Sequence, residues 1–439
     1  MKRIEALIVA LTLGAGSLAS SPARAQTRPA WGRIALFGNS SSTTQAGGQS
    51  NTFNELIANV TFESASGDEV GYEYRGDMRL SGYPGSTDRT RRASVYDLYA
   101  CIRLRDGSVG VRFGQMWLNE LGGLGSVGGA MVEVRQRSQP GRGRWRASLF
   151  GGFEPNILDV GYVSQVRKFG GLVAYDGLGA RRHVVGFVHV RDSGMTERSV
   201  LVFTNFLPID KRVFVYQAAE YDVRGPGVTG AGSLTYFFTN GRYAPNDRIE
   251  FQGLFHRGRS IDSRSLVRDQ LDGRPIDPRA LEGLRFESVS GRVTVRLARN
   301  VRVFGGYGQD RNNRDDAVAG RLNYGLFASN VGGIGIDINA SDSRINRGTS
   351  GSYDSWYVSV GRTFGGHVYL SADYGSSLSV FRFTGSDGFV IETRPHSRRL
   401  AFSGLFNLTH RLSLLATAER VDDGTSVQTR VMSGMTCRF

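Results

Sequence analysis

Polar and apolar residues alternate one by one along most of the chain from Trp31 onward. Between residues 71 and 80, one side of this alternation is apolar, with Tyr72, Tyr74, Met78 and Leu80, and the other side is charged, with Glu73, Arg75, Asp77 and Arg79. Successive side chains of a pleated strand point to opposite faces, whereas a helix repeats every 3.6 residues. The pattern therefore predicts a strand with one apolar and one charged face, and little helix.

The same pattern recurs as hairpins. Alternating runs at 96–105 and 109–117 flank the turn 106–108, and runs at 132–137 and 144–149 flank the Pro-Gly turn 140–143. Similar runs lie at 292–297, 356–363, 367–374 and 412–419. Short turns such as 298–300 and 364–366 alternate with longer polar segments at 39–49, 81–91, 310–316 and 341–351. Short turns at one rim and longer loops at the other are typical of outer-membrane barrels.

We therefore expect an all-β transmembrane antiparallel up-and-down β-barrel over residues 26–439, with about 22 strands and 18 or 20 as alternatives. An even number places both chain ends at the periplasmic rim. A soluble secreted sandwich or propeller also alternates, but the dense charge on the non-apolar face disfavours it. One segment departs from the pattern: residues 257–284 are long and charged, and Asp277-Pro278 is a plausible N-cap and first turn of a short helix. We expect an extracellular loop or a segment folded into the lumen there, and a solvated loop without a special role remains open.

The start of the chain has the features of an export signal. Met1-Lys2-Arg3 is basic, residues 6–19 form a short apolar stretch, and Ala23-Arg24-Ala25 is an A-x-A site. This predicts a Sec-type signal peptide, residues 1–25, that is cleaved after Ala25. No later stretch approaches the 18 apolar residues that a transmembrane helix needs. Cys101 and Cys437 are too few for a disulfide framework, so we expect them to be unpaired.

The last nine residues, VMSGMTCRF, place Val431, Met435, Cys437 and Phe439 on one face of an extended strand, with Ser433 as the polar exception. This ending, the export signal and the repeated alternation resemble bacterial outer-membrane β-barrels and, more loosely, porin-like ones. In that family an aromatic last residue with alternating apolar partners is an assembly signal. The resemblance implies an outer-membrane location and recognition by the barrel-assembly machinery during biogenesis.

Charged residues form a ladder along the polar face of the predicted strands between 70 and 150. Nine arginines meet four acids there: Arg75, Arg79, Arg103, Arg105, Arg112, Arg135, Arg137, Arg144 and Arg146 against Glu73, Asp77, Asp97 and Glu133. If this face is the lumen, the surplus predicts a pore that attracts anions. The alternative is cross-strand ion pairing that stiffens the wall without selectivity. The net charge of +14 in the whole chain also predicts contacts with lipid head groups and lipopolysaccharide phosphates, and no nucleic-acid partner is expected.

The search for catalytic and cofactor motifs finds little. Residues 123–128 match G-x-G-x-x-G, but no βαβ unit surrounds them. There is no G-x-S-x-G, H-E-x-x-H or C-x-x-C motif, and the six histidines are scattered. We therefore expect no catalysis, cofactor or metal. The favoured function is passive diffusion of small hydrophilic solutes with a bias toward anions. The alternatives are a non-conducting surface protein that acts as a scaffold, in adhesion or in binding lipopolysaccharide or a partner, and, less favoured, a barrel-embedded hydrolase.

Overall fold

The structure is a computed structural model that describes residues 30–64, 71–86, 89–137, 139–156, 159–226, 232–384 and 390–439. The expected signal peptide, residues 1–25, lies outside the described residues. The strands are β1 (Ala30–Gln45), β2 (Ser50–Ser64), β3 (Gly71–Gly82), β4 (Arg92–Leu104), β5 (Val109–Trp117), β6 (Ser126–Arg135), β7 (Arg144–Pro155), β8 (Tyr162–Asp176), β9 (Arg182–Asp192), β10 (Met195–Pro208), β11 (Val213–Arg224), β12 (Ser233–Tyr243), β13 (Ile249–Ser260), β14 (Leu284–Ala298), β15 (Val301–Asn312), β16 (Asp315–Val331), β17 (Ile336–Asn346), β18 (Gly351–Phe364), β19 (Val368–Thr384), β20 (Val390–Thr393), β21 (His396–Asn407), β22 (Leu412–Asp422) and β23 (Ser426–Arg438). The helical segments are η1 (Asn119–Leu124), η2 (Leu178–Ala180), α2 (Ser263–Leu271), α3 (Pro278–Glu282) and η3 (Gly348–Ser350).

The strands form one closed antiparallel barrel. Each strand pairs with its neighbours in the chain, and β1 pairs with β23, where Ile34 lies opposite Cys437. β20 and β21 both pair with β19, at its two ends, and they are separated only by residues 394–395. Pro395 has no backbone N–H and cannot donate to a ladder, so the strand is interrupted there. β20 and β21 are therefore two parts of one barrel strand. Counted in this way the barrel has 22 strands, which confirms the expected architecture and count.

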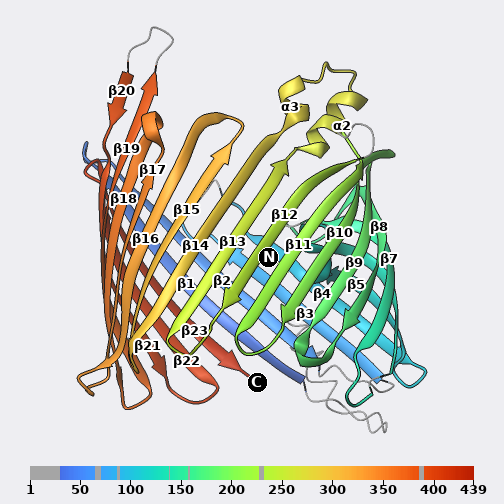
Figure 1. Ribbon diagram of the computed structural model, residues 1–439, viewed down its shortest axis with the longest axis horizontal. Coiled ribbons are helices and arrows are strands. Elements are labelled where there is room, and N and C mark those ends of the chain that lie inside the picture. Colours follow the sequence, from blue (N-terminus) through green and yellow to red (C-terminus); the bar gives the residue numbers. More distant parts are fainter. Residues whose placement is uncertain are drawn as a thin grey trace.

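Figure 1 shows the strands tilted steeply around the barrel, with the C-terminus and the start of β1 at one end and α2 and α3 at the other. We call these ends the terminal rim and the loop rim. Connections at the terminal rim include the short turns 105–108, 299–300 and 365–367, whereas the loop rim carries the longest connection, residues 261–283. Among the described residues, no helix is long and apolar enough to cross a membrane.

The two faces of the wall differ as the alternation predicts. Large apolar side chains stand exposed at every second position, for example Tyr72 at 68% and Leu149 at 73%, although both belong to paired strands. Many of the intervening positions carry charged or small residues. This outer apolar surface has no partner within the described chain and suits a lipid environment, where closure of the sheet satisfies every backbone polar group.

Several segments that we expected to be loops are mostly strand. β1 continues through Gln45, so residues 39–45 pair with β2 and β23, and β15 and β16 are joined by residues 313–314 alone. The predictions at 39–49 and 310–316 were wrong because polar side chains do not prevent backbone pairing beyond the apolar band. The long connection is also shorter than 257–284, since β13 continues through Ser260.

An apolar core lies inside one half of the barrel. Met116, Leu121, Val127, Leu172 and Val188 belong to a cluster of buried side chains from β5, β6, β7, β8, β9, β10 and η1. Their strand positions alternate with the exposed outer residues, so they face inward. In this half of the barrel, packed side chains therefore fill the lumen.

Candidate functional site

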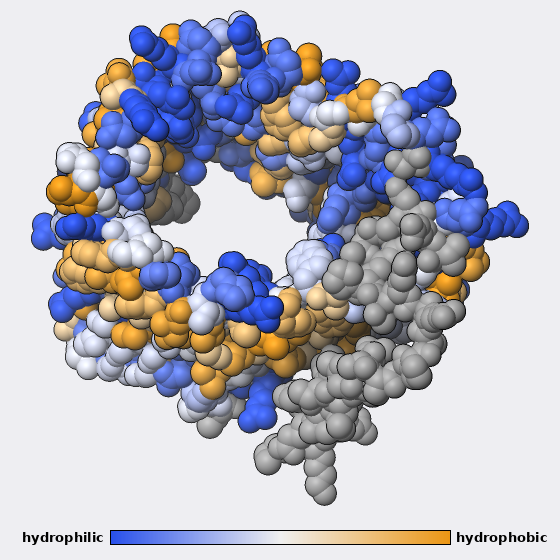
Figure 2. Space-filling view, turned by 90° about the horizontal axis from the view of Figure 1, so that it is seen from below, coloured by the Kyte–Doolittle hydropathy of each residue, from blue (hydrophilic) through white to orange (hydrophobic). Residues whose placement is uncertain are grey.

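An open passage runs through the barrel beside this core. Figure 2, which looks from the terminal rim, shows the opening directly, with hydrophilic residues gathered along part of its edge. The residues on its wall are the ones that a transported solute would meet. Three parts of the inner surface carry the charge: the ladder on β3–β7, the inward segment η1, and a basic hollow at the terminal rim.

The ladder residues within strands lie on the inner face. Register places them at alternating positions of neighbouring strands, opposite the exposed apolar set: Glu73, Arg75, Asp77, Arg79, Asp97, Arg103, Arg112, Glu133, Arg135, Arg144 and Arg146. Arg105 and Arg137 are exceptions. Arg105 follows β4 in a turn with a positive φ of 50°, and Arg137 lies beyond the end of β6, exposed and paired with Asp106. Both were expected on a strand face and instead belong to turns at the terminal rim, because β4 and β6 end before them.

Arg103 is the centre of a buried ion-pair network. Its guanidinium is only 2% exposed and donates from Nε to Glu73 at 2.6 Å and from a terminal nitrogen to Glu133 at 3.0 Å. Arg112 and Arg146 lie 3.7 and 3.8 Å from the other oxygen of Glu133. A buried charge is tolerated only when it is paired and hydrogen-bonded. This network therefore crosses β3 to β7 as a structural element.

The more open ladder arginines are paired as well. Arg75 lies 3.3 Å from Asp97 and 3.7 Å from Glu63, and Arg79 lies 3.4 Å from Glu55. Arg144 approaches Asp176 at 3.8 Å. Of the two interpretations of the ladder, this geometry favours cross-strand pairing, since acids from β2 and β8 that lie outside the counted strands offset the surplus.

The segment η1 connects β5 and β6 and lies inside the barrel. Leu121 is fully buried in the inner core, and the Thr204 hydroxyl on β10 donates to the Glu120 carbonyl at 3.2 Å. The Glu120 carboxylate accepts from Arg146 at 2.5 Å and lies 3.9 Å from Arg182 on β9. η1 thus narrows the passage from one side, held by one apolar anchor, two ion pairs and one hydrogen bond.

Sequence reasoning missed η1 and considered only the glycines at 123–128. The available signal was the spacing of Leu118, Leu121 and Leu124, three residues apart in an otherwise polar, glycine-rich stretch. That is the repeat of a 3₁₀-helix, and η1 is one.

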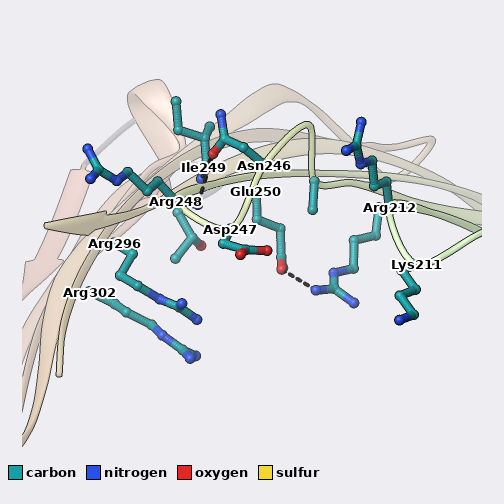
Figure 3. A pocket seen from close by; sticks show the side chains of 12 residues that line it. Lys211, Arg212, Asn246, Asp247, Arg248, Ile249, Glu250, Arg296 and Arg302 are labelled. Carbon is teal, nitrogen blue, oxygen red and sulfur yellow. Dashed lines mark hydrogen bonds and ion pairs between the residues drawn. The ribbon is translucent and has the colours of Figure 1, made fainter. Parts of the chain in front are cut away.

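A basic hollow of about 520 Å³ lies at the terminal rim, under the turns after β10, β12 and β14. Its charged lining residues are Lys211, Arg212, Arg242, Arg248, Arg296 and Arg302 with Asp247 and Glu250. In Figure 3, Lys211, Arg296 and Arg302 point to the same side of the wall as Asp247, whereas Arg212 points to the opposite side. We call these charged lining residues the basic vestibule. Only Arg242 has an acid within ion-pair distance among the described residues, Glu250 at 2.7 Å. The lining of the hollow therefore holds six cationic side chains and two carboxylates.

Arg296 and Arg302 are the most exceptional pair of the vestibule. They lie directly opposite each other on β14 and β15, and Figure 3 shows the two guanidinium groups side by side. Like charges at directly opposite strand positions repel. The Nε of Arg296 is also buried without a hydrogen-bond partner. The wall therefore holds positive charge here that the described residues do not neutralise.

The long connection at the loop rim folds back over the barrel through α2. Arg264 pairs with Glu154 at 2.9 Å and with Glu197 at 3.3 Å, and the hydrogen bond that it donates to Glu154 raises the pKa of Arg264 above its ordinary value. Asp262 caps α2 by accepting from the backbone N–H of Ser265 at 3.0 Å. Asp277 and Pro278 begin α3 as N-cap and first residue, as the sequence indicated.

The four C-terminal residues that carry the expected assembly signal share the outer face of β23. Val431 and Phe439 are about half exposed, and Met435 and Cys437 lie between them on the same face. Neither Cys437 nor Cys101 forms a disulfide. No cluster of three or more histidine, cysteine or acidic residues suited to a metal occurs within the described parts of the chain.

No protein-family model and no curated protein matches this chain. Among solved structures, it is similar to a mutant of the ferric enterobactin receptor (PfeA) from Pseudomonas aeruginosa, with a TM-score of 0.55, 9% identity, and coverage of 94% of this chain and 81% of that one. Further matches are OccK8 (OprE) from Pseudomonas aeruginosa, with a TM-score of 0.44, 10% identity and coverage of 93% and 98%, and OccAB1 from Acinetobacter baumannii, with 0.45, 11% and coverage of 95% and 99%. At these identities the likeness to PfeA concerns the fold alone, which is that of an outer-membrane β-barrel.

Proposed function

We propose that the protein is a porin-like channel of the bacterial outer membrane through which small hydrophilic solutes diffuse passively, with a bias toward anions. The observation that carries the proposal is the open passage in Figure 2, whose terminal-rim mouth holds the unneutralised basic vestibule. The apolar outer face supports residence in lipid. In this proposal the terminal rim lies in the periplasm and the loop rim faces outward, and no step requires catalysis or a cofactor.

The anion bias follows from the field of the vestibule rather than from the ladder. Charges at a low-dielectric mouth raise the local concentration of the opposite charge, and salt screens this effect within about 10 Å at 0.1 M. Ladder arginines paired with acids create little net field at that distance. Lipopolysaccharide and the barrel-assembly machinery are proposed partners, because the outer face and the C-terminal residues are arranged as in barrels that meet both.

Planar-bilayer conductance tests the proposal. Purified mature protein should give ohmic steps, and a tenfold KCl gradient should produce a reversal potential that favours chloride. The bias should weaken as the salt concentration rises, because the vestibule is open to solvent. Folded protein that gives no steps would overturn the channel and support the non-conducting surface protein, and a cation-favouring potential would overturn the bias.

A further inference from the structure

Aromatic rings form a continuous stripe across the inner faces of β10 to β14. Ring centroids of Phe206 and Phe214 are 5.0 Å apart, those of Tyr216 and Phe238 are 5.9 Å apart, and those of His256 and Phe286 are 4.8 Å apart. Phe206 lies opposite Tyr216, and Phe238 and Tyr236 both contact His256. We call these seven residues the inner aromatic stripe: Phe206, Phe214, Tyr216, Tyr236, Phe238, His256 and Phe286.

The stripe extends from rim to rim. Phe214 is the second residue of β11, beside the terminal rim, and Phe286 is the third residue of β14, beside the loop rim. Its terminal end reaches the vestibule, since Phe214 lies opposite Arg242. A solute that follows the stripe would therefore cross the whole barrel on one surface.

The rings remain partly exposed, unlike the apolar core on the other half of the wall. None of the seven is buried, whereas Leu121, Val188 and Val200 of the core are fully buried. Apolar surface left in contact with water costs free energy that packing would recover. An exposed aromatic track along a solute path therefore indicates a surface that a ligand covers.

A hollow of about 380 Å³ lies at the loop-rim end of the stripe, where Tyr236 and Phe286 meet Glu220, Asp222 and Thr235. Its carboxylates are in ion pairs: Arg198 lies 2.9 Å from Glu220 and 2.8 Å from Asp222, and Glu197 lies 3.3 Å from Arg264. The hollow thus combines aromatic faces with charge-neutralised hydrogen-bond acceptors.

We propose that this hollow and the stripe bind the sugar rings of neutral oligosaccharides, an inference that rests on the proposed channel and names one class of its solutes. A pyranose ring has an apolar C–H face, which packs on an aromatic ring, and a rim of hydroxyl groups, which donate to carboxylates. The ion pairs leave the hollow no excess positive charge to attract anions, and a flat aromatic solute would lack the hydroxyl donors. The two ends of the passage therefore select different chemistry.

Ion current through the full mature chain in planar bilayers tests this inference, with maltohexaose added at the loop-rim side as the probe. We expect reversible interruptions of the current that increase with sugar concentration, and none with sorbitol, which has the hydroxyls but no ring. Tyr236→Ala and Phe238→Ala should each weaken the apparent affinity by about fivefold or more, the effect of losing one ring contact. Phe238→Trp should keep it.

Phe304→Ala is the matched control, because Phe304 is an inner-face ring outside the stripe that stacks on Arg292. Conduction without block by maltohexaose, or equal block in the alanine variants, would overturn the inference and leave the channel intact. Stronger block by benzyl alcohol than by the sugar would overturn the choice of ligand. If the folded protein does not conduct, the channel fails, and calorimetric titration of maltohexaose then decides whether the stripe binds sugar.

Discussion

Gly32 and Phe439 close the barrel as a hydrogen-bonded pair. The N–H of Gly32 donates to the Phe439 carbonyl at 2.9 Å, and the N–H of Phe439 donates back at 3.1 Å. The ring of Phe439 lies over Gly32, where a Cβ would stand 2.6 Å from its Cζ and 2.7 Å from the Thr61 carbonyl oxygen. Only glycine leaves room for this ring, which shields the backbone of the neighbouring strand from lipid.

Phe439→Ala should lower the yield of folded barrel, because it removes both the ring over the seam and the proposed assembly signal. The folded state should lose about 1 kcal/mol, as for a cross-strand aromatic contact. The measurement is the fraction of heat-modifiable, protease-resistant protein in outer membranes. Phe62→Ala is the control, since the Phe62 ring covers Gly76, its partner on the neighbouring strand β3, inside the sheet. Equal yields of the two variants would show that position 439 has no role in assembly beyond local packing.

Arg103→Gln should destabilise the barrel without changing its ion selectivity. The substitution leaves Glu73 and Glu133 buried with one partner fewer, and breaking a buried pair costs about 3–5 kcal/mol. Urea unfolding in lipid measures this loss. Arg311→Gln, which removes an exposed pair with Glu287, should cost less than about 1 kcal/mol. If Arg103→Gln changed the reversal potential at unchanged stability, the ladder would be a selectivity element after all.

Neutralising the vestibule should shift the reversal potential toward cations. The triple variant Arg248→Gln, Arg296→Gln and Arg302→Gln removes three charges that have no acid partner within ion-pair distance among the described residues. Arg399→Gln with Glu419→Gln is the matched control, because it removes an inner-wall pair at 2.6 Å and keeps the net charge. A triple variant that keeps the wild-type potential would contradict the vestibule as the source of the bias.

Glu120→Gln should release η1 from the wall and enlarge the passage. The carboxylate loses its ion pair with Arg146, which keeps Asp176 and Glu133 as partners, so the inner network survives while the segment loses about 1–3 kcal/mol of anchoring. Single-channel recording should show a larger and noisier conductance. Glu392→Gln removes a carboxylate paired with Arg382 and Arg394 in the hairpin of β20, and should leave the conductance unchanged. A wild-type conductance in Glu120→Gln would mean that Leu121 and the hydrogen bond from Thr204 suffice to hold η1.

The first turn of α2 should weaken in acid. Hydrogen bonds from the Ser265 backbone and hydroxyl lower the pKa of Asp262 below its ordinary value of 3.8. The folded-state pKa is depressed, so the stabilisation is present above pH 3.8 and is lost as the pH falls through the folded value. Hydrogen exchange of the α2 amides should therefore accelerate, after correction for the intrinsic rate, only below about pH 4. Asp262→Ala should cost about 1 kcal/mol at neutral pH and abolish this pH dependence.

The sequence predicts the lipid-facing half of this fold better than the inner half. Outward residues such as Leu149 and Trp145 must be apolar at every second position, so alternation locates β7 and its neighbours directly. In β9, by contrast, Val184, Val185 and Val188 occupy both faces, and the period is lost where the inner core packs. His183 and His189 share the outer face with Phe187, and His183 lies next to the terminal rim.

The charge distribution needed tertiary structure. Counting along β3 to β7 gave a surplus of arginine, but Arg75 and Arg79 are paired with Glu63 and Glu55 of β2, and Arg144 and Arg146 with Asp176 of β8. The unpaired cations come instead from the turns after β10 and β12 and from the facing ends of β14 and β15, which are far apart in the chain. No local pattern links Lys211, Arg248 and Arg302, because they belong to three successive hairpins that only strand pairing places side by side at one mouth.

The inner core stiffens one side of the barrel wall and not the other. Strands β5 to β10 pack against buried side chains inside the barrel. The remaining strands enclose the passage, and their shape depends on the backbone hydrogen bonds between them. Lateral pressure from the bilayer should therefore flatten the unbraced arc first. In the proposed channel, a solute would therefore pass between a rigid part of the wall and a compliant part.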